Sequence, residues 1–328
     1  VKLGDHSTMD SQRYMDIGDG NVYLAVSDPL DAYDVELEDL IANDDVPYFD
    51  EVSQIRFAGS EDYSVIYDEN GKSICADDIY FTADGKPLDT SRVNSYISKL
   101  RYLDLTDYVT YRVTDEELSA YGLDDPELSV SVDYTDDGTS DTFVLHISRD
   151  PAEKKSAADA EDEEASDITA YARVGDSKII YQISGSSYRS LMAAGYNDLR
   201  HQEIFSGDFD DVTGIDVTLD GETYTLTSQK DGKERTWLCG EAEIKIGDLQ
   251  DALETLTAEE FTSEKATGQQ EISLTLHLDH EDEPELTITL YRCDGSKCLA
   301  VVDGKSVAYV PRGEMVTLAE AVRVFALN

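Results

Sequence analysis

A hairpin pattern occurs three times along this 328-residue chain, and such internal repetition constrains the fold more strongly than any other feature of the sequence. Each copy contains an alternating strand, a short polar turn and a second strand that carries a tyrosine. The turn pairs Asp19-Gly20 and Asp303-Gly304 supply the positive φ angles that tight hairpin turns require, and Gly175-Asp176 serves the middle copy. We therefore predict β-hairpins over residues 14–26, 171–183 and 299–310.

A second pattern occurs twice, and each time it leads to an amphipathic helix. Residues 52–57 resemble residues 212–217, and each segment precedes a strand that begins with tyrosine. Apolar side chains at helical spacing follow, with Ser91 expected to cap the first helix and Asp248 the second. A pair of strands with period-two alternation comes next, which indicates antiparallel sheet with one face in water. The two pairs are residues 128–134 with 143–147 and residues 272–278 with 286–290.

The order of these segments predicts a repeated unit of strands, helix, strand pair, hairpin and short helix. The expected fold class is α+β, with tandem repeated units of antiparallel sheet and one or two helices packed on one face of each. Residues 46–205 are expected to form a complete second unit with an acidic insertion near residues 150–167, and residues 206–328 a third unit. Residues 1–45 are expected to be the C-terminal end of a truncated first unit.

The charge of the chain restricts its partners, because 26 basic side chains stand against 71 acidic ones and the net charge is −45. Nucleic acid is excluded as a partner, since proteins bind phosphate backbones by neutralising them with Lys and Arg. An anionic membrane surface is disfavoured for the same reason. The chain begins at Val1 without a leader, so we expect a targeting segment to have been removed.

The sequence contains fragments of enzyme motifs, but none is complete. Gly71-Lys72-Ser73 and Gly304-Lys305-Ser306 resemble the end of a phosphate-binding loop, but both lack the earlier glycine and fall in predicted turns. The sequence contains neither a Gly-x-Ser-x-Gly elbow nor a His-Glu-x-x-His helix. We therefore predict no catalytic residues and no cofactor site.

One acidic segment contains residues that could gather a divalent metal: His277, Asp279, His280 and Asp282. The alternative is a solvent-facing turn between two strands, which Pro284 and the density of charge favour. In the acidic insertion, a weak calcium contact is the alternative to a mobile surface segment.

Two of the four cysteines, Cys293 and Cys298, flank a four-residue turn. A hairpin there would place their Cα atoms about 4.5–5.5 Å apart, within the range that a disulfide can close. Two free thiols are the alternative, because cross-strand bridges are often strained. The other two cysteines, Cys75 and Cys239, lack the paired spacing of a zinc ribbon.

Three features occur together in a fixed order: Tyr121-Gly122-Leu123-Asp124-Asp125-Pro126, the hairpins described above, and Asp198-Leu199-Arg200. In this respect nearly the entire chain resembles the bacterial family DUF4340, a domain of unknown function. The resemblance implies a domain outside the cytoplasmic membrane on an N-terminal membrane or lipid anchor, sometimes encoded beside gliding-type ABC transporters. The family has no established activity, so the resemblance assigns no catalytic residues.

The segment around Tyr121 also has a structural explanation. Thr114 and Glu117 are spaced as a capping box that opens a short helix, Gly122 ends that helix, and Pro126 leads into the next strand. A loop that contacts a ligand is the alternative.

Two classes of function follow from these patterns. The sequence favours a non-enzymatic extracytoplasmic repeat module at the cell envelope, which binds a protein or an envelope polymer as an accessory of an envelope or ABC-transporter system. The alternative is an uncharacterised enzyme, or a small-ligand or calcium-binding protein, with a site built from scattered carboxylates. Tyr121, Tyr171 and Tyr181 are candidate contact residues, although tyrosines on strands also pack against their cross-strand neighbours.

Overall fold

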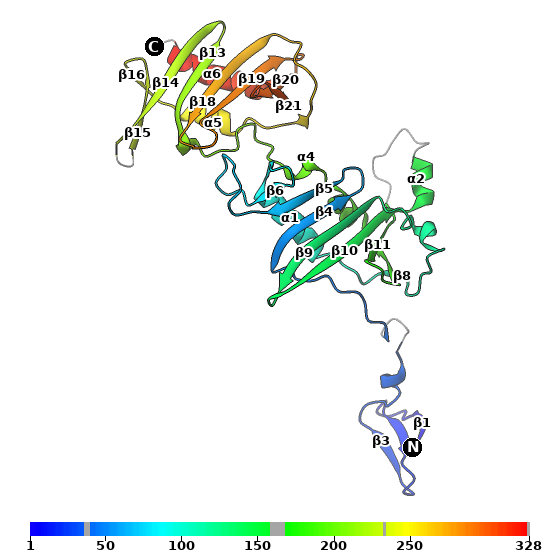
Figure 1. Ribbon diagram of the computed structural model, residues 1–328. Helices are drawn as coiled ribbons and strands as arrows, with labels where there is room; N and C mark the ends of the chain where they lie inside the picture. The colour runs from blue at the N-terminus through cyan, green and yellow to red at the C-terminus, as the bar shows by residue number, and fades with distance from the viewer. Residues whose placement is uncertain (36–39, 158–167, 232–233, 327–328) are drawn as a thin grey trace.

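The computed structural model describes residues 1–35, 40–157, 168–231 and 234–326 (Figure 1). Within these residues the strands form three antiparallel sheets, which we call the N-terminal, central and C-terminal sheets. The fold is therefore α+β, as predicted. The N-terminal sheet has the order β1-β2-β3, and a short 3-10 helix, Asp31–Tyr33, follows it. Its strands are β1 (Lys2–His6), β2 (Arg13–Asp16) and β3 (Val22–Ala25).

The central sheet has the order β7-β6-β5-β4-β9-β10-β11-β12-β8 among the described residues. Its strands are β4 (Glu51–Ala58), β5 (Tyr63–Tyr67), β6 (Tyr80–Thr82), β7 (Pro87–Leu88), β8 (Tyr108–Thr110), β9 (Leu128–Asp136), β10 (Thr139–Arg149), β11 (Ala170–Val174) and β12 (Ile180–Ile183). Its helices are α1 (Thr90–Arg101), the 3-10 helix Leu118–Tyr121, α2 (Pro151–Ala157), α3 (Gly185–Met192) and α4 (Tyr196–Leu199). Residues 158–167 of the predicted acidic insertion, with the calcium contact considered there, lie outside the described residues.

The C-terminal sheet has the order β16-β15-β14-β13-β18-β19-β20-β21-β17 among the described residues. Its strands are β13 (Val212–Leu219), β14 (Glu222–Asp231), β15 (Glu234–Cys239), β16 (Ala242–Ile244), β17 (Glu260–Phe261), β18 (Gln270–Leu278), β19 (Glu285–Arg292), β20 (Lys297–Val302) and β21 (Lys305–Pro311). Its helices are the 3-10 helix Phe209–Asp211, α5 (Gly247–Glu254) and α6 (Arg312–Ala326).

Each of the two large sheets has its own hydrophobic core. Alternate side chains of the central strands are buried together with α1 and α3, and the Tyr96 hydroxyl on α1 donates a hydrogen bond to the Leu191 carbonyl of α3 (2.9 Å). The C-terminal strands are buried against α5 and α6 in the same way. The alternation predicted from the sequence thus corresponds to two faces of each sheet: apolar side chains lie on the face that the helices cover, and polar side chains lie on the other.

The helix caps differ from the prediction. Helix α1 begins at Thr90 instead of after Ser91, because the Asp89 carboxylate accepts hydrogen bonds from the backbone N–H groups of Ser91 and Arg92. Helix α5 begins at Gly247, so Asp248 is not its cap but lies in its first turn, where a negative charge is favourable.

The Tyr-Gly-Leu segment forms the predicted helix stop, although the helix is of the 3-10 type. The Glu117 carboxylate accepts hydrogen bonds from the Thr114 N–H and hydroxyl (2.9 and 2.8 Å). Gly122 then ends the helix with a left-handed φ of 70°, which glycine adopts at little cost.

The turn that the sequence predicts at Asn70-Gly71 is present, since the Gly71 N–H donates a hydrogen bond to the Asp68 carbonyl (3.2 Å). It does not close a hairpin, because β5 ends at Tyr67 and β6 begins only at Tyr80. The loop between them, residues 68–79, packs Ile74 against the core of the C-terminal sheet. This loop therefore reaches across to the neighbouring body.

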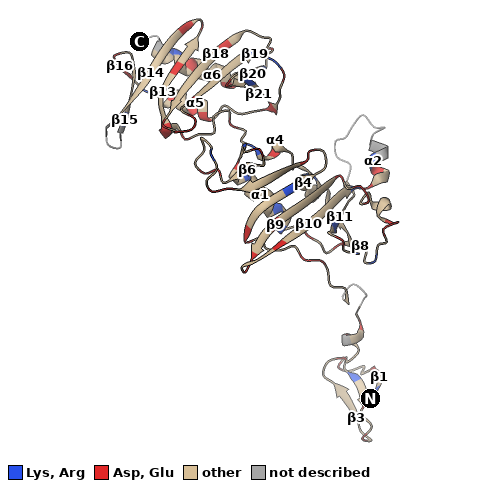
Figure 2. Ribbon diagram, viewed as in Figure 1, with Lys and Arg blue, Asp and Glu red and all other residues tan. Residues whose placement is uncertain are grey.

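The acidic side chains lie mainly on loops and strand ends of all three sheets, with few Lys and Arg among them (Figure 2). Within the described part of the chain, no helix has the length and apolar character needed to cross a membrane.

Candidate functional site

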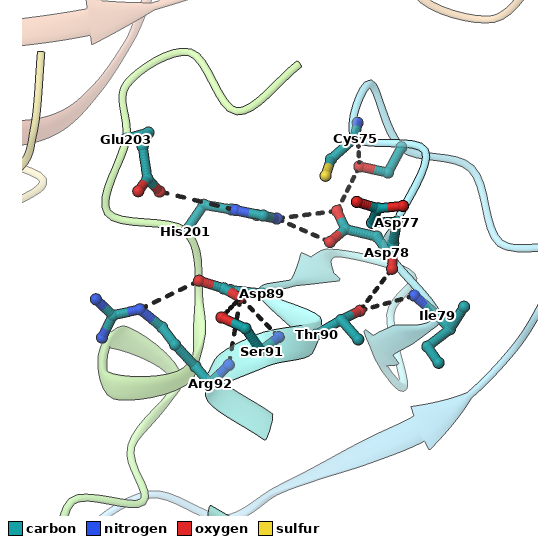
Figure 3. Close-up of polar contacts among 11 residues, drawn as sticks. Cys75, Asp77, Asp78, Ile79, Asp89, Thr90, Ser91, Arg92, His201 and Glu203 are labelled. Carbon is teal, nitrogen blue, oxygen red and sulfur yellow. Dashed lines mark hydrogen bonds and ion pairs between the residues drawn. The ribbon is translucent and has the colours of Figure 1, made fainter. Parts of the chain in front are cut away.

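A polar cluster lies where the chain passes from the central to the C-terminal sheet (Figure 3). His201 is on the segment between Leu199, which belongs to the central core, and Ile204, which belongs to the C-terminal core. The Leu199 carbonyl accepts a hydrogen bond from the Asp89 N–H (3.0 Å), and the Gln202 carbonyl accepts one from the Ala258 N–H (2.7 Å). The segment around His201 is thus fixed to both bodies.

The centre of the cluster is a histidine–carboxylate pair. His201 Nε2 lies 2.9 and 3.0 Å from the two carboxylate oxygens of Asp78. The Asp78 side chain is only 1% exposed, and that of His201 is 17% exposed. The Ser73 hydroxyl donates to Asp78 (2.7 Å) and accepts from the Cys75 N–H (3.1 Å), so it orients both the carboxylate and the cysteine.

Carboxylates also lie near the second ring nitrogen of the histidine. His201 Nδ1 is 3.9 Å from a Glu203 carboxylate oxygen. Asp89 lies close by, held by its hydrogen bonds at the start of α1 and by an ion pair with Arg92 (3.3 Å). The imidazole is therefore positioned between carboxylates that come from separate parts of the chain.

The electrostatics of the cluster follow from these neighbours. Burial lowers the pKa of His201, but the hydrogen bond and charge of Asp78, with the charges of Asp89 and Glu203, outweigh burial and leave the pKa raised. Burial, followed by the negative charges of Asp78 and Asp77, raises the pKa of the Cys75 thiol despite a backbone hydrogen bond. The thiol is thus protonated in the absence of a positive charge.

The residue types in the cluster are those that bind transition metals. Cys75, Asp78 and His201 can each offer one ligand atom, and these atoms lie within 4.8 Å of one another. Asp89, His201 and Glu203 form a second such group that shares the histidine. Cysteine sulfur, imidazole nitrogen and carboxylate oxygen together are a ligand set typical of zinc.

A groove opens beside the cluster, with a volume of about 230 Å³. It is lined by His201 and Glu203 on one side and by Leu286, Val302 and Val307 of the C-terminal body on the other. The cluster is therefore reached from the seam between the two bodies.

The metal ligands predicted from the sequence lie elsewhere. His277 Nε2 lies 2.9 Å from an Asp216 carboxylate oxygen, and its Nδ1 lies 3.3 Å from Glu285. Asp282 forms an ion pair with Lys72 (2.6 Å). Within the described residues, His277, Asp279, His280 and Asp282 are not brought together as a group that could hold a metal.

The two cysteines of the predicted bridge are free thiols in the structure. Cys293 is exposed and Cys298 is buried, and burial raises the pKa of Cys298 to about 11. The Cys293 N–H donates to the Lys297 carbonyl (3.1 Å) across the turn. The bridge between them stays a prediction.

The three candidate contact tyrosines are packed against neighbouring residues. Tyr181 is fully buried, and its hydroxyl bonds to Asp44. Tyr171 is nearly buried, donates to Asp150 (2.9 Å) and meets Tyr121 edge to face at 5.2 Å. These partners lie on a 3-10 helix and in loops, so the contacts pack the tyrosines within the fold but do not join neighbouring strands.

The sequence alone does not show the His201 cluster, because Cys75, Asp78 and Asp89 lie more than 100 residues before His201 and no short motif joins them to it. Two features of the sequence lie beside the cluster: Gly71-Lys72-Ser73, whose serine contacts Asp78, and Asp198-Leu199-Arg200, which ends one residue before the histidine. In the structure Leu199 is buried, and the Arg200 guanidinium lies over the rings of Tyr196 (5.1 Å) and Phe261 (4.4 Å). That motif therefore marks the seam at which the cluster is built.

Comparison with known proteins gives one finding. A family model described as "Domain of unknown function (DUF4340)" matches residues 80–275, a range that includes Asp89, His201 and Glu203 and begins just after Asp78. Neither a search of curated proteins nor one of solved structures gives a significant match. Because the family model covers more than half of the chain, this protein belongs to the DUF4340 family.

Proposed function

We propose that this protein is a non-enzymatic repeat module that acts outside the cytoplasm at the cell envelope, as a binding or scaffolding accessory of an envelope or ABC-transporter-associated system. The observation that carries the proposal is the agreement between the central and C-terminal sheets in strand order, register and irregularity. Repeated units usually present extended surfaces to partners instead of a single enclosed catalytic centre.

The strand orders support two copies of one unit. Counted from its first strand, the central sheet places its strands in the order 4-3-2-1-6-7-8-9-5, and the C-terminal sheet has the same order. A helix, α1 or α5, follows the fourth strand in both, and another, α3 or α6, follows the last. We assign residues 46–205 and 206–328 to these two units.

The registers of the two sheets support the same assignment. Directly paired residues form a row across the strands β5, β4, β9, β10 and β11 of the central sheet. In that order they are Tyr63, Phe57, Val130, Leu145 and Val174. The row in the C-terminal sheet pairs Tyr224, Val217, Leu274, Ile288 and Val302. Phe57 and Val217 are the residues that the sequence pattern aligns.

An irregularity recurs at the same place in both units. The register shifts between Val52 and Gln54 in β4 and between Val212 and Gly214 in β13. The hydroxyl at the shift donates to a partner carbonyl in both cases, from Ser53 to Asp133 (3.2 Å) and from Thr213 to His277 (3.0 Å). Because β-bulges are kept within families as structural features, a shared bulge favours common descent of the two units.

This equivalence also accounts for His277, which occupies the position of Asp133. Arg56 forms an ion pair with Asp133 on the central sheet (2.5 Å), and Asp216 contacts His277 at the equivalent place on the C-terminal sheet (2.9 Å). The acidic and basic partners are exchanged between the two units. A cross-strand polar contact with Asp216 is therefore the role that the geometry favours for this histidine.

The N-terminal sheet fits the end of a further unit. Its three consecutive strands pair antiparallel in chain order, as β10, β11 and β12 do. Residues 17–21 connect β2 to β3, so the connection is longer than the tight Asp19-Gly20 turn that the sequence predicts. Its apolar side chains are partly exposed, as at Leu3 (36%), Val22 (70%) and Leu24 (40%). The remaining elements of a unit would cover such side chains.

The polar sheet faces are the surfaces that we assign to partner binding. On the C-terminal sheet, hydroxyl groups pair across the strands, as between Ser273 and Thr289 (2.9 Å) and between Thr218 and Thr223 (3.1 Å). A broad face of hydroxyls and charge pairs suits a polar protein surface or an envelope polymer. The placement outside the cytoplasm rests on the family resemblance alone.

Site-specific photo-crosslinking in cells that express the full-length protein tests this proposal. The crosslinking residue is placed on the polar faces at Ser64 or Thr225, which are equivalent positions, and on the helix side at Lys99 or Glu320 as controls. We expect adducts in the envelope fraction from the polar-face positions only. Equal adducts from the helix-side positions, or recovery of the protein in the cytoplasmic fraction, would contradict the proposal.

A further inference from the structure

We propose that Cys75, Asp78 and His201 bind a divalent transition metal of the zinc class, and that this metal joins the loop before β6 to the segment that connects the two large bodies. The inference does not depend on the proposed function, because it rests on the geometry of this cluster alone. It would hold equally in an enzyme or in a scaffold.

The donor set selects the class of metal. Calcium and magnesium prefer oxygen ligands, whereas a site with one sulfur, one imidazole nitrogen and one carboxylate oxygen suits zinc. Zinc bonds of about 2.0 Å to nitrogen and 2.3 Å to sulfur bring ligand atoms to within about 4.3 Å of one another. The ligand atoms of Cys75, Asp78 and His201 are already within 4.8 Å, so only small movements are needed.

The two ring nitrogens of His201 face different surroundings, as metal-binding histidines require. Nε2 points to Asp78, and a metal placed between them would replace the proton that now links them. Nδ1 lies 3.9 Å from a Glu203 carboxylate oxygen, which after a small movement could accept a hydrogen bond from the Nδ1–H group and so fix the tautomer. A carboxylate behind the ligating imidazole is the usual outer partner in zinc sites.

Asp89 has a different role in this arrangement. Its carboxylate already accepts from the N–H groups of Ser91 and Arg92 and pairs with the Arg92 side chain. It therefore stays outside the metal and adds negative charge beside the imidazole. With three protein ligands, zinc has a fourth position open, which a water from the adjoining groove would occupy.

A histidine–aspartate pair without metal is the competing explanation. Such a pair accounts for the contact of Asp78 with His201, but it gives no role to the cysteine side chain beside them. Metal binding uses all three groups: the Cys75 thiol releases its proton to solvent, and the neutral imidazole keeps its proton on Nδ1. The thiol is thus the group that distinguishes the two explanations.

Titration of the whole chain with Co²⁺ and Zn²⁺ provides the test, because Co²⁺ bound to a thiolate gives a charge-transfer band that carboxylates cannot give. We expect one Co²⁺ per chain with this band, and its displacement by one Zn²⁺. Cys75→Ser should abolish the band, whereas Cys239→Ser, which removes a half-buried thiol on β15 of the C-terminal sheet, should leave it unchanged. His201→Gln should weaken Zn²⁺ binding at least tenfold, while His277→Gln should not.

Glu203→Gln keeps the inference testable if substitutions at the buried Asp78 prevent folding. Glu203 is half exposed and lies outside the metal, so the variant should fold like the unchanged chain in the presence of a chelator. Loss of an outer carboxylate should lower the Zn²⁺ affinity about 10–100-fold. The inference is overturned if the chain gives no thiolate band, if the band survives Cys75→Ser, or if Zn²⁺ affinity is the same in the His201 and Glu203 variants as in the unchanged chain.

Discussion

Replacing Tyr181 by phenylalanine removes a single oxygen atom from the hydrophobic core of the central sheet. The side chain is fully buried on β12, and its hydroxyl donates to the Asp44 carboxylate (3.0 Å) and accepts from the Asp44 N–H (2.6 Å). The Ser177 hydroxyl donates to the same carboxylate (2.6 Å). These bonds fix the segment that precedes β4 to strand β12 of the central sheet.

The expected loss of stability follows from these two bonds. A neutral hydrogen bond contributes about 0.5–1.5 kcal/mol to the free energy of unfolding, and one to a charged group about 1.5–3 kcal/mol. In the variant, the Asp44 carboxylate keeps its hydrogen bond from Ser177 and, being half-buried, can also bond to water. Both effects reduce the loss of stability. We expect Tyr181→Phe to lower the free energy of unfolding by about 1–3 kcal/mol.

Urea denaturation of Tyr181→Phe, with Tyr102→Phe as the matched control, measures this effect. Tyr102 is 77% exposed, so its variant should change the free energy of unfolding by less than about 0.5 kcal/mol. If Tyr181→Phe is as stable as the unchanged chain but loses a crosslinked partner, then this tyrosine is a contact residue and its packing role is refuted.

Three further predictions concern single side chains of the two large bodies. Gly122→Ala should lower the free energy of unfolding by about 1 kcal/mol or more in thermal denaturation, because an L residue is strained at φ 70°, and an unchanged melting temperature would contradict this. The hydrogen bonds from Arg56 hold the pKa of Asp133 below its usual value, so this pair stabilises the fold above about pH 4 and the contribution is lost as the pH falls through the lowered pKa. Asp133→Asn should therefore flatten the dependence of stability on pH below about pH 4, and an unaltered pH profile would argue against the pair. Leu145→Ala and Ile288→Ala, at equivalent core positions, should each cost about 2–5 kcal/mol in urea denaturation, and a negligible cost at either position would speak against its place in the core.

Much of the fold could be predicted because its strands alternate clearly and its turns carry glycine. The hairpins at residues 14–26, 171–183 and 299–310 are confirmed, as are the strand pairs β9–β10 and β18–β19. The edge strands β7, β8 and β17 were not predicted, because strands of two or three residues are too short to show a period. Strands β8 and β17 pair with strands far along the chain, β12 and β21, so the local sequence does not show their partners.

The candidate site could not be predicted in the same way. The sequence predicts a turn at Asn70-Gly71, but it does not show that this turn opens the long loop that carries Cys75 and Asp78. Nothing local in the sequence shows that this loop returns to the segment of His201, because that approach depends on the packing of two bodies. Only the tertiary structure brings the thiol, the carboxylate and the imidazole together.

The position of the cluster follows from a difference between the two large bodies. In the C-terminal sheet, β14 and β15 are joined closely, with Asp231 paired to Glu234, whereas the corresponding strands β5 and β6 are separated by residues 68–79. That loop supplies two of the three ligands that we propose, and Ile74 within it packs against the neighbouring core. Under the proposed repeat, the elements that the two bodies share build the sheets, and the loop found in one of them supplies the site. A metal bound there would tie the loop to the connecting segment and so resist separation of the two bodies at their seam.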